Sequence, residues 1–425
     1  MENTLAPESG RSIKKQTLLD MIKVLGPGIM LASTSIGGSH LVASTKSGAI
    51  YGWQLVLVIA LVNLFKYPFF RAGIQYTMAT GNSLVEGYKG MGRIYLWSFT
   101  FLSVVAAFVN VSALLLFSAS LFGYIFKTGL PLEYNALILI SACLVILFAG
   151  RYQALDKMSK VIVGTLSLVT IFVVIAAFTN GAVAPADYQP PTIWDLSAIG
   201  FIVIMMGWMP TTIEVSSITS LWLKDQRKVA NVTPRSALFD FNVGYITTAV
   251  LALFFLALGA LLLNGSGTEL ATSGIGFSHQ LVGLYSSNIG EWSRYIVAIL
   301  AFFCIFGSTL TCIDGYPRAL AEAQRLILNK PENINYHRFW MLLVAAGAML
   351  ILFFYKAELV PMLNFAMILA FITTPIFALL NFRLISKTNL TGVLALTTRL
   401  KVLNWAGLVY LFGFLAVFIW WKFIL

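Results

Sequence analysis

A chain of 425 residues that is 59% hydrophobic and only 11% charged cannot cover a water-facing globule with polar side chains. Apolar runs of roughly 20 residues, the length that crosses a bilayer, recur from end to end. The composition therefore excludes a soluble globular protein and predicts an all-α integral membrane protein. The formal net charge of +11 would suggest a nucleic-acid ligand in a soluble protein, but the placement of the basic residues gives it another origin.

About eleven membrane-spanning helices are predicted from these runs. The segments are 25–48, 51–70, 95–124, 133–150, 159–182, 196–222, 236–264, 293–316, 338–355, 359–384 and 404–423. Only short polar connections lie between them, so no separate soluble domain is expected.

Basic residues are concentrated in alternate connections between these segments. They are Lys14, Lys15, Lys23, Lys89, Arg93, Arg151, Lys157, Lys160, Lys224, Arg227, Lys228, Arg235, Arg318, Arg325, Lys330, Arg383, Lys387, Arg399 and Lys401. Because cytoplasmic loops carry the excess of lysine and arginine, the N-terminus is expected to be cytoplasmic and, with an odd number of spans, the C-terminus outside. The net charge is then explained by the orientation of a multi-pass protein in the plasma membrane, and nucleic acid is not an expected partner.

Two of the predicted helices contain a break. Gly37 and Gly38 interrupt the first, and the segment MMGWMPTTIE (Met205–Glu214) interrupts the sixth. Pro210 lacks a backbone donor and should end a helix near Gly207–Met209, after which Thr211 or Thr212 could cap a new one. Interrupted helices at corresponding places in two halves are typical of secondary transporters built from inverted repeats. We expect repeat one at about 20–184, repeat two at about 194–388 and an additional helix at about 404–423.

Longer stretches resemble a known family. The segment Gly26–Leu55, the segment from Asn63 to Glu86, the Met209–Pro210 pair with Ser216 and Ser217, and the segment Asn364–Arg383 are similar to the Nramp family of divalent-metal transporters. The resemblance implies a LeuT-like fold of the APC superfamily, an inverted 5+5 repeat with helices 1 and 6 broken, and alternating-access transport.

The metal-site residues of that family are mostly replaced. Its Asp-Pro-Gly-Asn motif falls on Gly37, Gly38, Ser39 and His40, and its methionine is kept as Met209. By the same resemblance, family histidines fall on Thr211 and Ser216, a third-helix acid pair on Asn110 and Ala113, and a glutamine on Met367. His40, which replaces the asparagine, and the retained Met209 would be the metal ligands if the site still binds a metal. Without an anionic ligand, the set does not suit a hard divalent ion.

The predicted substrate site lies between the two breaks. Its residues are Gly37, Gly38, Ser39, His40, Gly207, Met209, Thr211 and Thr212. Each restarted helix would direct free N–H groups and a positive dipole end at the substrate, with no carboxylate nearby, which favours a small monovalent anion or carboxylate such as bicarbonate. Glu214, about one turn into the second half of helix six, is a candidate for proton coupling, and Lys66 is expected to snorkel to the cytoplasmic surface.

Three other functions are weighed against anion transport. Transport of a divalent ion such as manganese, iron or magnesium through an altered site follows from the resemblance, and a solute-sensing receptor could use the same scaffold. No HExxH, GxSxG or paired-cysteine motif is present, so an enzyme is not expected. The three cysteines lie singly in apolar runs, and no cofactor is predicted. The expected partners are a small ion and the bilayer, with coupling to protons or sodium left open.

Overall fold

The computed structural model describes residues 21–424 apart from 23, 151, 186, 268–270, 272, 356 and 357. The predicted basic residues Lys14, Lys15, Lys23 and Arg151 lie outside this part of the chain. The described residues form helices joined by short connections, without a strand among them. The prediction of an all-α membrane fold is confirmed.

Each predicted span corresponds to one long helix or to two half-helices. The first five are α2 (Pro27–Ser35) with η1 (Ser39–Ser44) and α3 (Thr45–Tyr51), α4 (Val56–Thr80), α6 (Arg93–Phe126), α7 (Leu132–Phe148) and α8 (Tyr152–Asn180). The next six are α9 (Ala198–Trp208) with α10 (Val215–Val229), α11 (Pro234–Leu262), α13 (Arg294–Leu328), α14 (Ile334–Tyr355), α15 (Leu359–Lys387) and α16 (Thr398–Phe423).

Four short elements fall outside the predicted spans. They are α5 (Leu84–Met91), α12 (Gly274–Ile289) and the 3-10 turns η2 (Glu291–Ser293) and η3 (Gly392–Leu394). In the described part of the chain, seven helices are long and apolar enough to cross a membrane. The two interrupted helices are not among these seven, because each half is too short to span a bilayer alone.

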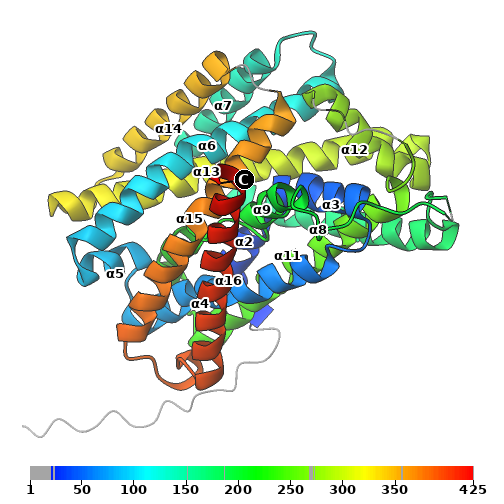
Figure 1. Cartoon of the computed structure of the whole chain (residues 1–425). Coiled ribbons are helices and arrows are strands. Elements are labelled where there is room, and N and C mark those ends of the chain that lie inside the picture. Colours follow the sequence, from blue (N-terminus) through cyan, green and yellow to red (C-terminus); the bar gives the residue numbers. More distant parts are fainter. Residues whose placement is uncertain are drawn as a thin grey trace, which may run out of the picture.

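The helices pack in two groups around the interrupted pair. Figure 1 shows α6, α13 and α14 side by side along one face and α2, α3 and α11 together on another, with α15 and α16 in front. Both halves of the first helix lie against α11 at glycines. A Cβ on Gly28 would collide with the carbonyl of Asp240, and one on Gly48 with the carbonyl of Leu256. Small residues let these backbones approach closely, as is usual between membrane helices.

A carboxylate on α11 also fixes where the first helix begins. The Asp240 oxygens accept hydrogen bonds from the backbone N–H groups of Gly26 (3.1 Å) and Gly28 (2.7 Å) at the start of α2. These donors have no partner within the helix, and a negative charge at a helix N-terminus is favourable. Asp240 therefore holds the first half-helix at a fixed height beside α11.

Candidate substrate site between the broken helices

The first helix is unwound where the Gly-Gly pair was predicted to break it. α2 ends at Ser35, and Ile36 has a non-helical backbone (φ −76°, ψ 86°) before the chain winds again from Ser39. The carbonyls freed by the break face α13. Ser308 Oγ on α13 donates to the carbonyl oxygens of Ser33 (2.9 Å) and Ile36 (3.4 Å). The break is thus stabilised by a neighbouring helix, which satisfies backbone groups that lipid could not.

The sixth helix is unwound at Met209–Thr212. α9 ends at Trp208, Met209 is extended (φ −90°, ψ 122°), and α10 begins at Val215 after Glu214. Thr211 or Thr212 was expected to cap the restarted helix, but Glu214 occupies the N-cap position. That expectation is wrong, because residues 212–215 form a turn that is closed by a hydrogen bond from the Val215 N–H to the Thr212 carbonyl (3.2 Å) before the helix begins. Both predicted breaks are confirmed.

A buried lysine occupies the second break. Lys66 of α4 is fully buried, and its ammonium donates to the carbonyl oxygens of Met206 (2.7 Å), Gly207 (3.1 Å) and Thr211 (3.4 Å). The expectation that Lys66 snorkels to the surface is wrong. The end of α9 offers unpaired carbonyls and the negative end of a helix dipole, which stabilise a cation at this depth.

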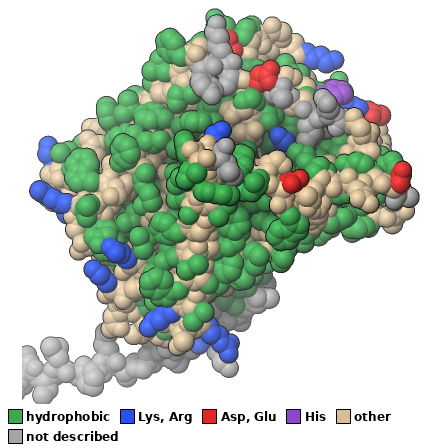
Figure 2. Space-filling view, in the orientation of Figure 1, with side chains coloured by type: hydrophobic (Ala, Val, Ile, Leu, Met, Phe, Trp, Pro, Cys, Tyr) green, Lys and Arg blue, Asp and Glu red, His purple; other side chains and the backbone are tan. Residues whose placement is uncertain are grey.

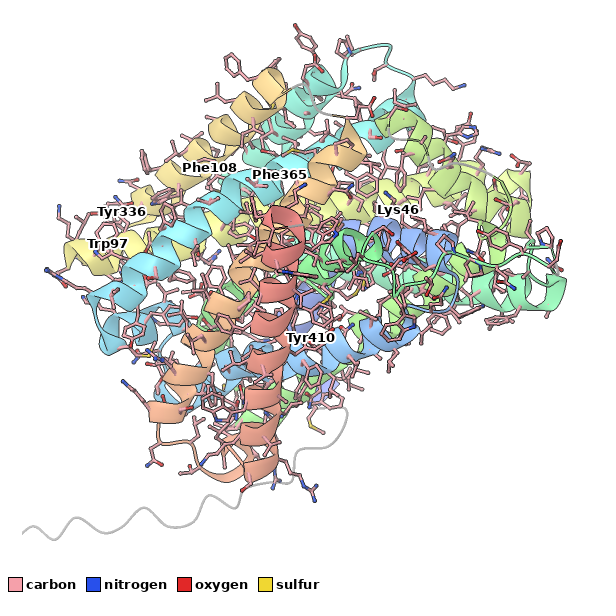
Figure 3. The ribbon with its side chains drawn as sticks, in the orientation of Figure 1. Lys46, Trp97, Phe108, Tyr336, Phe365 and Tyr410 are labelled. Atoms are coloured by element: carbon pink, nitrogen blue, oxygen red, sulfur yellow. The ribbon has the colours of Figure 1, made fainter. Side chains whose placement is uncertain are left out.

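The additional helix α16 covers this part of the site from outside. Tyr410 projects from α16 on the side of α4 (Figure 3), its ring centroid lies 4.7 Å from that of Phe65, and its hydroxyl lies 3.8 Å from Met206 Sδ. Phe65 is the neighbour of Lys66 in α4. The lysine is therefore separated from the lipid side by an aromatic layer.

A small cavity lies between the two breaks. Its volume is about 30 Å³, which is room for roughly two water molecules or one small ion. The lining residues are Thr34, Ser35, Gly38, Ser39, Asn110, Leu114, Trp208, Thr211, Thr212, Val215, Cys312 and Tyr316. Hydroxyl, amide and indole groups supply its polar surface, and none of the lining side chains carries a charge.

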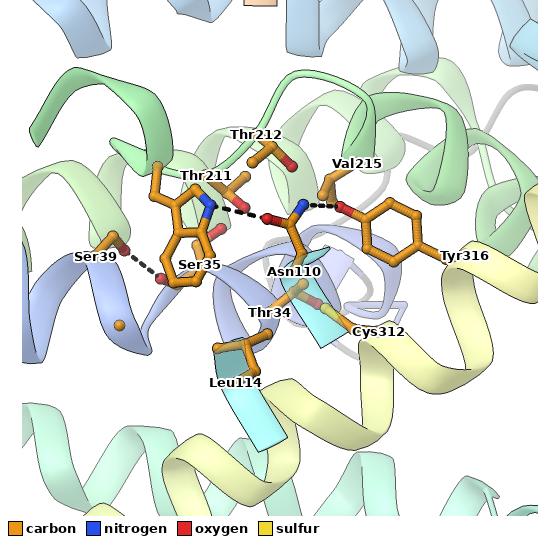
Figure 4. Close-up of a pocket in the computed structure, with 12 residues that line it drawn as sticks. Thr34, Ser35, Ser39, Asn110, Leu114, Thr211, Thr212, Val215, Cys312 and Tyr316 are labelled. Carbon is orange, nitrogen blue, oxygen red and sulfur yellow. Dashed lines mark hydrogen bonds between the residues drawn. The ribbon is translucent and has the colours of Figure 1, made fainter. Parts of the chain in front are cut away.

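One wall of the cavity is a continuous chain of hydrogen bonds that ends on a carboxylate. Trp208 Nε1 donates to Asn110 Oδ1 (3.1 Å), and Asn110 Nδ2 donates to the Tyr316 hydroxyl (2.7 Å). Asn110 stands between the two rings beneath Thr211 and Thr212 (Figure 4). The Tyr316 hydroxyl in turn donates to Glu214 Oε1 (3.0 Å), while Glu214 Oε2 is buried without a hydrogen bond of normal geometry.

Four of the predicted site residues line this cavity, namely Gly38, Ser39, Thr211 and Thr212. Gly38 also allows the Trp208 ring to lie across the cavity, because a Cβ there would come within 2.6 Å of that ring. The other four lie elsewhere in the packing. A Cβ on Gly37 would face Ser308 on α13 (3.1 Å), one on Gly207 would collide with the carbonyl of Met367 on α15, and Met209 is a fully buried core residue.

His40, the remaining predicted residue, points away from the cavity towards α11. Its Nε2 lies 2.8 Å from the Thr248 carbonyl, and its Nδ1 lies 2.8 Å from Ser39 Oγ. Nδ1 also lies 3.0 Å from the Ser35 carbonyl, so both ring nitrogens face hydrogen-bond partners within the protein, whichever tautomer the ring adopts. Neither nitrogen is then free to bind a substrate in this conformation.

The site does not have the donor set of a divalent-metal centre. Across the described residues, no group of three or more histidine, cysteine, aspartate or glutamate side chains lies close enough to hold a metal ion. His40 and Met209, the two candidate ligands, are both outside the cavity. Hard divalent ions bind carboxylate and carbonyl oxygens, so the hydroxyl-lined cavity fits them poorly.

Sequence reasoning missed the largest polar contributors to the site. Thr34, Asn110, Trp208 and Tyr316 all line the cavity, Thr34 and Trp208 in the broken helices and Asn110 and Tyr316 in long apolar helices. Polar side chains at membrane depth usually mark a functional path, so Asn110 and the Ser33–Ser35 run could have been selected on that signal. Trp208 and Tyr316 carry no such signal, because aromatic residues are common throughout the chain.

Paired breaks in an all-helical membrane fold, with a polar cavity between them, define a secondary transporter of the LeuT-like class. The fold agrees with that of a mutant of the Eremococcus coleocola manganese transporter, at a TM-score of 0.70 and 13% identity, over 96% of this chain and 88% of that one. It also agrees with MhsT in complex with L-phenylalanine, at a TM-score of 0.62 and 15% identity, over 92% of this chain and 97% of that one.

The family model for natural resistance-associated macrophage protein-like (Nramp) transporters matches residues 28–421, so the chain belongs to the Nramp family. The uncharacterized protein PM0681 of Pasteurella multocida is 44% identical over 97% of this chain and 95% of its own length. The divalent metal cation transporter MntH of Staphylococcus saprophyticus is 23% identical over 59% of this chain and 58% of its own length. The family resemblance predicted from the sequence is confirmed.

Proposed function

We propose that this Nramp-family transporter carries a small monovalent anion or carboxylate, such as bicarbonate, by alternating access. The observation that carries the proposal is the buried ammonium of Lys66 beside a cavity that has neutral hydrogen-bond donors and no lining carboxylate. Lys66 bonds the carbonyl of Thr211, and Thr211 lines the cavity. The positive charge of Lys66 lies next to the lining residue Thr211 and favours an anion in the cavity. The hydroxyl, amide and indole donors of the lining would replace the water molecules that hydrate the free anion.

The electrostatic basis differs from the one expected from the sequence. The restarted sixth helix was expected to direct an uncompensated positive end at the substrate, with no carboxylate nearby. That expectation is wrong, because Glu214 is the N-cap residue of α10 and bonds Tyr316, which lines the cavity. Positive charge at the site comes from the Lys66 amine, and the net charge depends on the protonation states of both Lys66 and Glu214.

This balance supports coupling of anion transport to a proton. With Glu214 ionised, its charge offsets that of Lys66, and the site is close to neutral. With Glu214 protonated, the ammonium is uncompensated, and an anion restores neutrality. Binding the anion would then favour binding a proton, and the two would cross the membrane together. Glu214 also lies 3.5 Å from Asn110, the position that aligns with a third-helix acid of the family, so a carboxylate reaches the same place from another helix.

Transport of a divalent metal is the second candidate, favoured by the names of the MntH relative and of the manganese transporter. It would require His40 and Met209 to turn into the cavity, with backbone carbonyls completing the coordination shell.

We further propose that residues of about 20–184 and 194–388 form the two inverted repeats and 404–423 the additional helix. The basic connections support a cytoplasmic N-terminus in the plasma membrane.

Uptake by proteoliposomes tests the proposal. The purified protein should accumulate labelled bicarbonate or formate, faster with an inward proton gradient, and should not accumulate manganese. Removing a cavity hydroxyl with Thr212→Val should weaken uptake several-fold. Ser47→Ala is the matched control, because its buried hydroxyl bonds only the Ala43 carbonyl (2.7 Å) away from the cavity. Saturable manganese uptake that Met209→Ala abolishes, without anion uptake, would replace this proposal with the metal one.

A further inference from the structure

A second hollow lies at the basic end of the molecule, where α15 ends and α16 begins. Its volume is about 500 Å³, and Tyr95 of α6, residues of α15 and residues of α16 form its walls. Figure 2 shows most of the lysine and arginine side chains on this face along the left and lower edges, where α5 and the α15–α16 connection lie. None of the transport-site residues takes part in this hollow.

Three cations line the hollow and no acidic residue does. Arg383 and Lys387 lie in the last turns of α15, and Lys401 lies in the first turn of α16. The Arg383 guanidinium donates to the Tyr95 hydroxyl (3.0 Å), which is neutral. Within the described ranges, none of the three forms a salt bridge with a carboxylate. The hollow therefore presents uncompensated positive charge.

Two of the cations, Lys387 and Lys401, lie at a different depth from the apolar walls, whereas Arg383 is adjacent to Phe382 in α15. Lys387 is the last residue of α15, whereas Phe382 lies five residues earlier, roughly 7 Å deeper along the helix. In the same way Trp405 lies four residues after Lys401 in α16, roughly 6 Å deeper along the helix. The rings of Phe382 and Trp405 meet edge to face at 5.3 Å, and the Trp405 side chain is 61% exposed.

We propose that this hollow is a binding site for an anionic phospholipid. The phosphate would lie between Arg383, Lys387 and Lys401 at the headgroup level, and the first acyl segments would pack on Trp405 and Phe382. Basic pockets between membrane helices on the cytoplasmic side recognise such headgroups, and exposed tryptophan is typical of the same interface. The layering of charge above apolar surface matches a phospholipid, whereas free phosphate would leave the aromatic wall uncovered.

Native mass spectrometry of the delipidated transporter tests this, with phosphatidylglycerol, phosphatidylcholine and inorganic phosphate as probes. Three near-surface cations should favour phosphatidylglycerol over phosphatidylcholine by roughly 100-fold in affinity. The double variant Arg383→Gln with Lys401→Gln should lose most of that preference. The matched control removes two exposed cations outside the hollow, Arg399→Gln with Lys422→Gln, and should keep it.

Equal binding of the two lipids would overturn the proposal, as would a preference that survives in the Arg383 and Lys401 double variant. Competition by inorganic phosphate at concentrations equal to those of the lipid would also overturn it, since the hollow would then be a simple anion site. All four positions are exposed, so the variants should fold, and thermal unfolding without added lipid checks this directly.

Discussion

Two substitutions of Lys66 distinguish the effect of its charge from the effect of its hydrogen bonds. Lys66→Met removes both, while Lys66→Gln keeps an amide donor that can bond at least one carbonyl of the broken helix. The two short bonds, to Met206 (2.7 Å) and Gly207 (3.1 Å), contribute about 1.5–3 kcal/mol each as bonds from a charged donor. Removing a buried charge also removes a desolvation cost of several kcal/mol, so the net loss of unfolding free energy is smaller than their sum.

The effect on the substrate follows from Coulomb's law. A cation roughly 7 Å from a monovalent anion, at an effective dielectric constant of about 20, stabilises it by roughly 2 kcal/mol, or about 30- to 50-fold in affinity. Both variants should therefore raise KM for the anion by about that factor. Lys66→Gln should unfold at a higher temperature than Lys66→Met, because it keeps a donor for the exposed carbonyls.

Proteoliposome uptake over a range of anion concentrations measures KM, and thermal unfolding in detergent measures stability. Arg71→Gln is the matched control, since this second cation on α4 donates to the Tyr67 hydroxyl (3.1 Å) and the Val393 carbonyl (3.2 Å), away from the break. The control should keep the KM of the parent protein within about twofold. If Lys66→Gln folds and retains the parent KM, the ammonium does not act on the substrate and the electrostatic argument is wrong.

Other expectations concern the carboxylates and the packing of the break. The Glu214→Gln variant should bind the anion at neutral pH at least as tightly as the parent protein, but its uptake should no longer respond to a proton gradient. If the gradient still accelerates uptake, another residue carries the coupled proton. Gly207→Ala should lower the unfolding free energy by at least ~1–3 kcal/mol, because its Cβ would collide with the carbonyl of Met367, and an unchanged melting temperature would contradict that packing. Burial favours protonation of Glu86 on α5, but hydrogen bonds from Lys224 (2.9 Å) outweigh it, so its pKa lies below the usual value. The stability that Glu86 contributes through its lowered pKa is fully present above pH ~4.3 and is lost as the pH falls through the folded-state pKa. Glu86→Gln should remove this pH dependence of the unfolding free energy.

Local chemistry explains why the two breaks could be predicted. Gly37, Gly38 and Pro210 alter the backbone wherever they occur, and their effect on a helix does not depend on distant residues. The same is true of the apolar runs, which place most of the spans within a few residues. The end of α4 was predicted about ten residues too early, because Arg71 and Gln75 follow residue 70 and hydropathy treats such polar residues as the end of a span.

Side-chain partners were less predictable, because they depend on which helices meet. Lys66 could only be placed at the second break once α4 was known to cross α9 there. His40 was expected at the substrate, but the winding after Gly38 turns its ring to Thr248 on α11. Glu214 was expected one turn into its helix and instead begins it, since the turn after Pro210 delays the restart. The errors for Lys66 and His40 concern tertiary contacts, and the error for Glu214 concerns a local turn.

We propose that an anion, and not a divalent metal, occupies the cavity between the breaks. Anomalous diffraction from crystals soaked in sodium bromide, and separately in manganese chloride, distinguishes the two, since both ions give an element-specific signal. We expect a bromide peak between Ser39, Asn110 and Thr212 that disappears in Lys66→Met, with no manganese peak at this position. A manganese peak beside Met209 or His40, with no bromide in the cavity, would contradict the account.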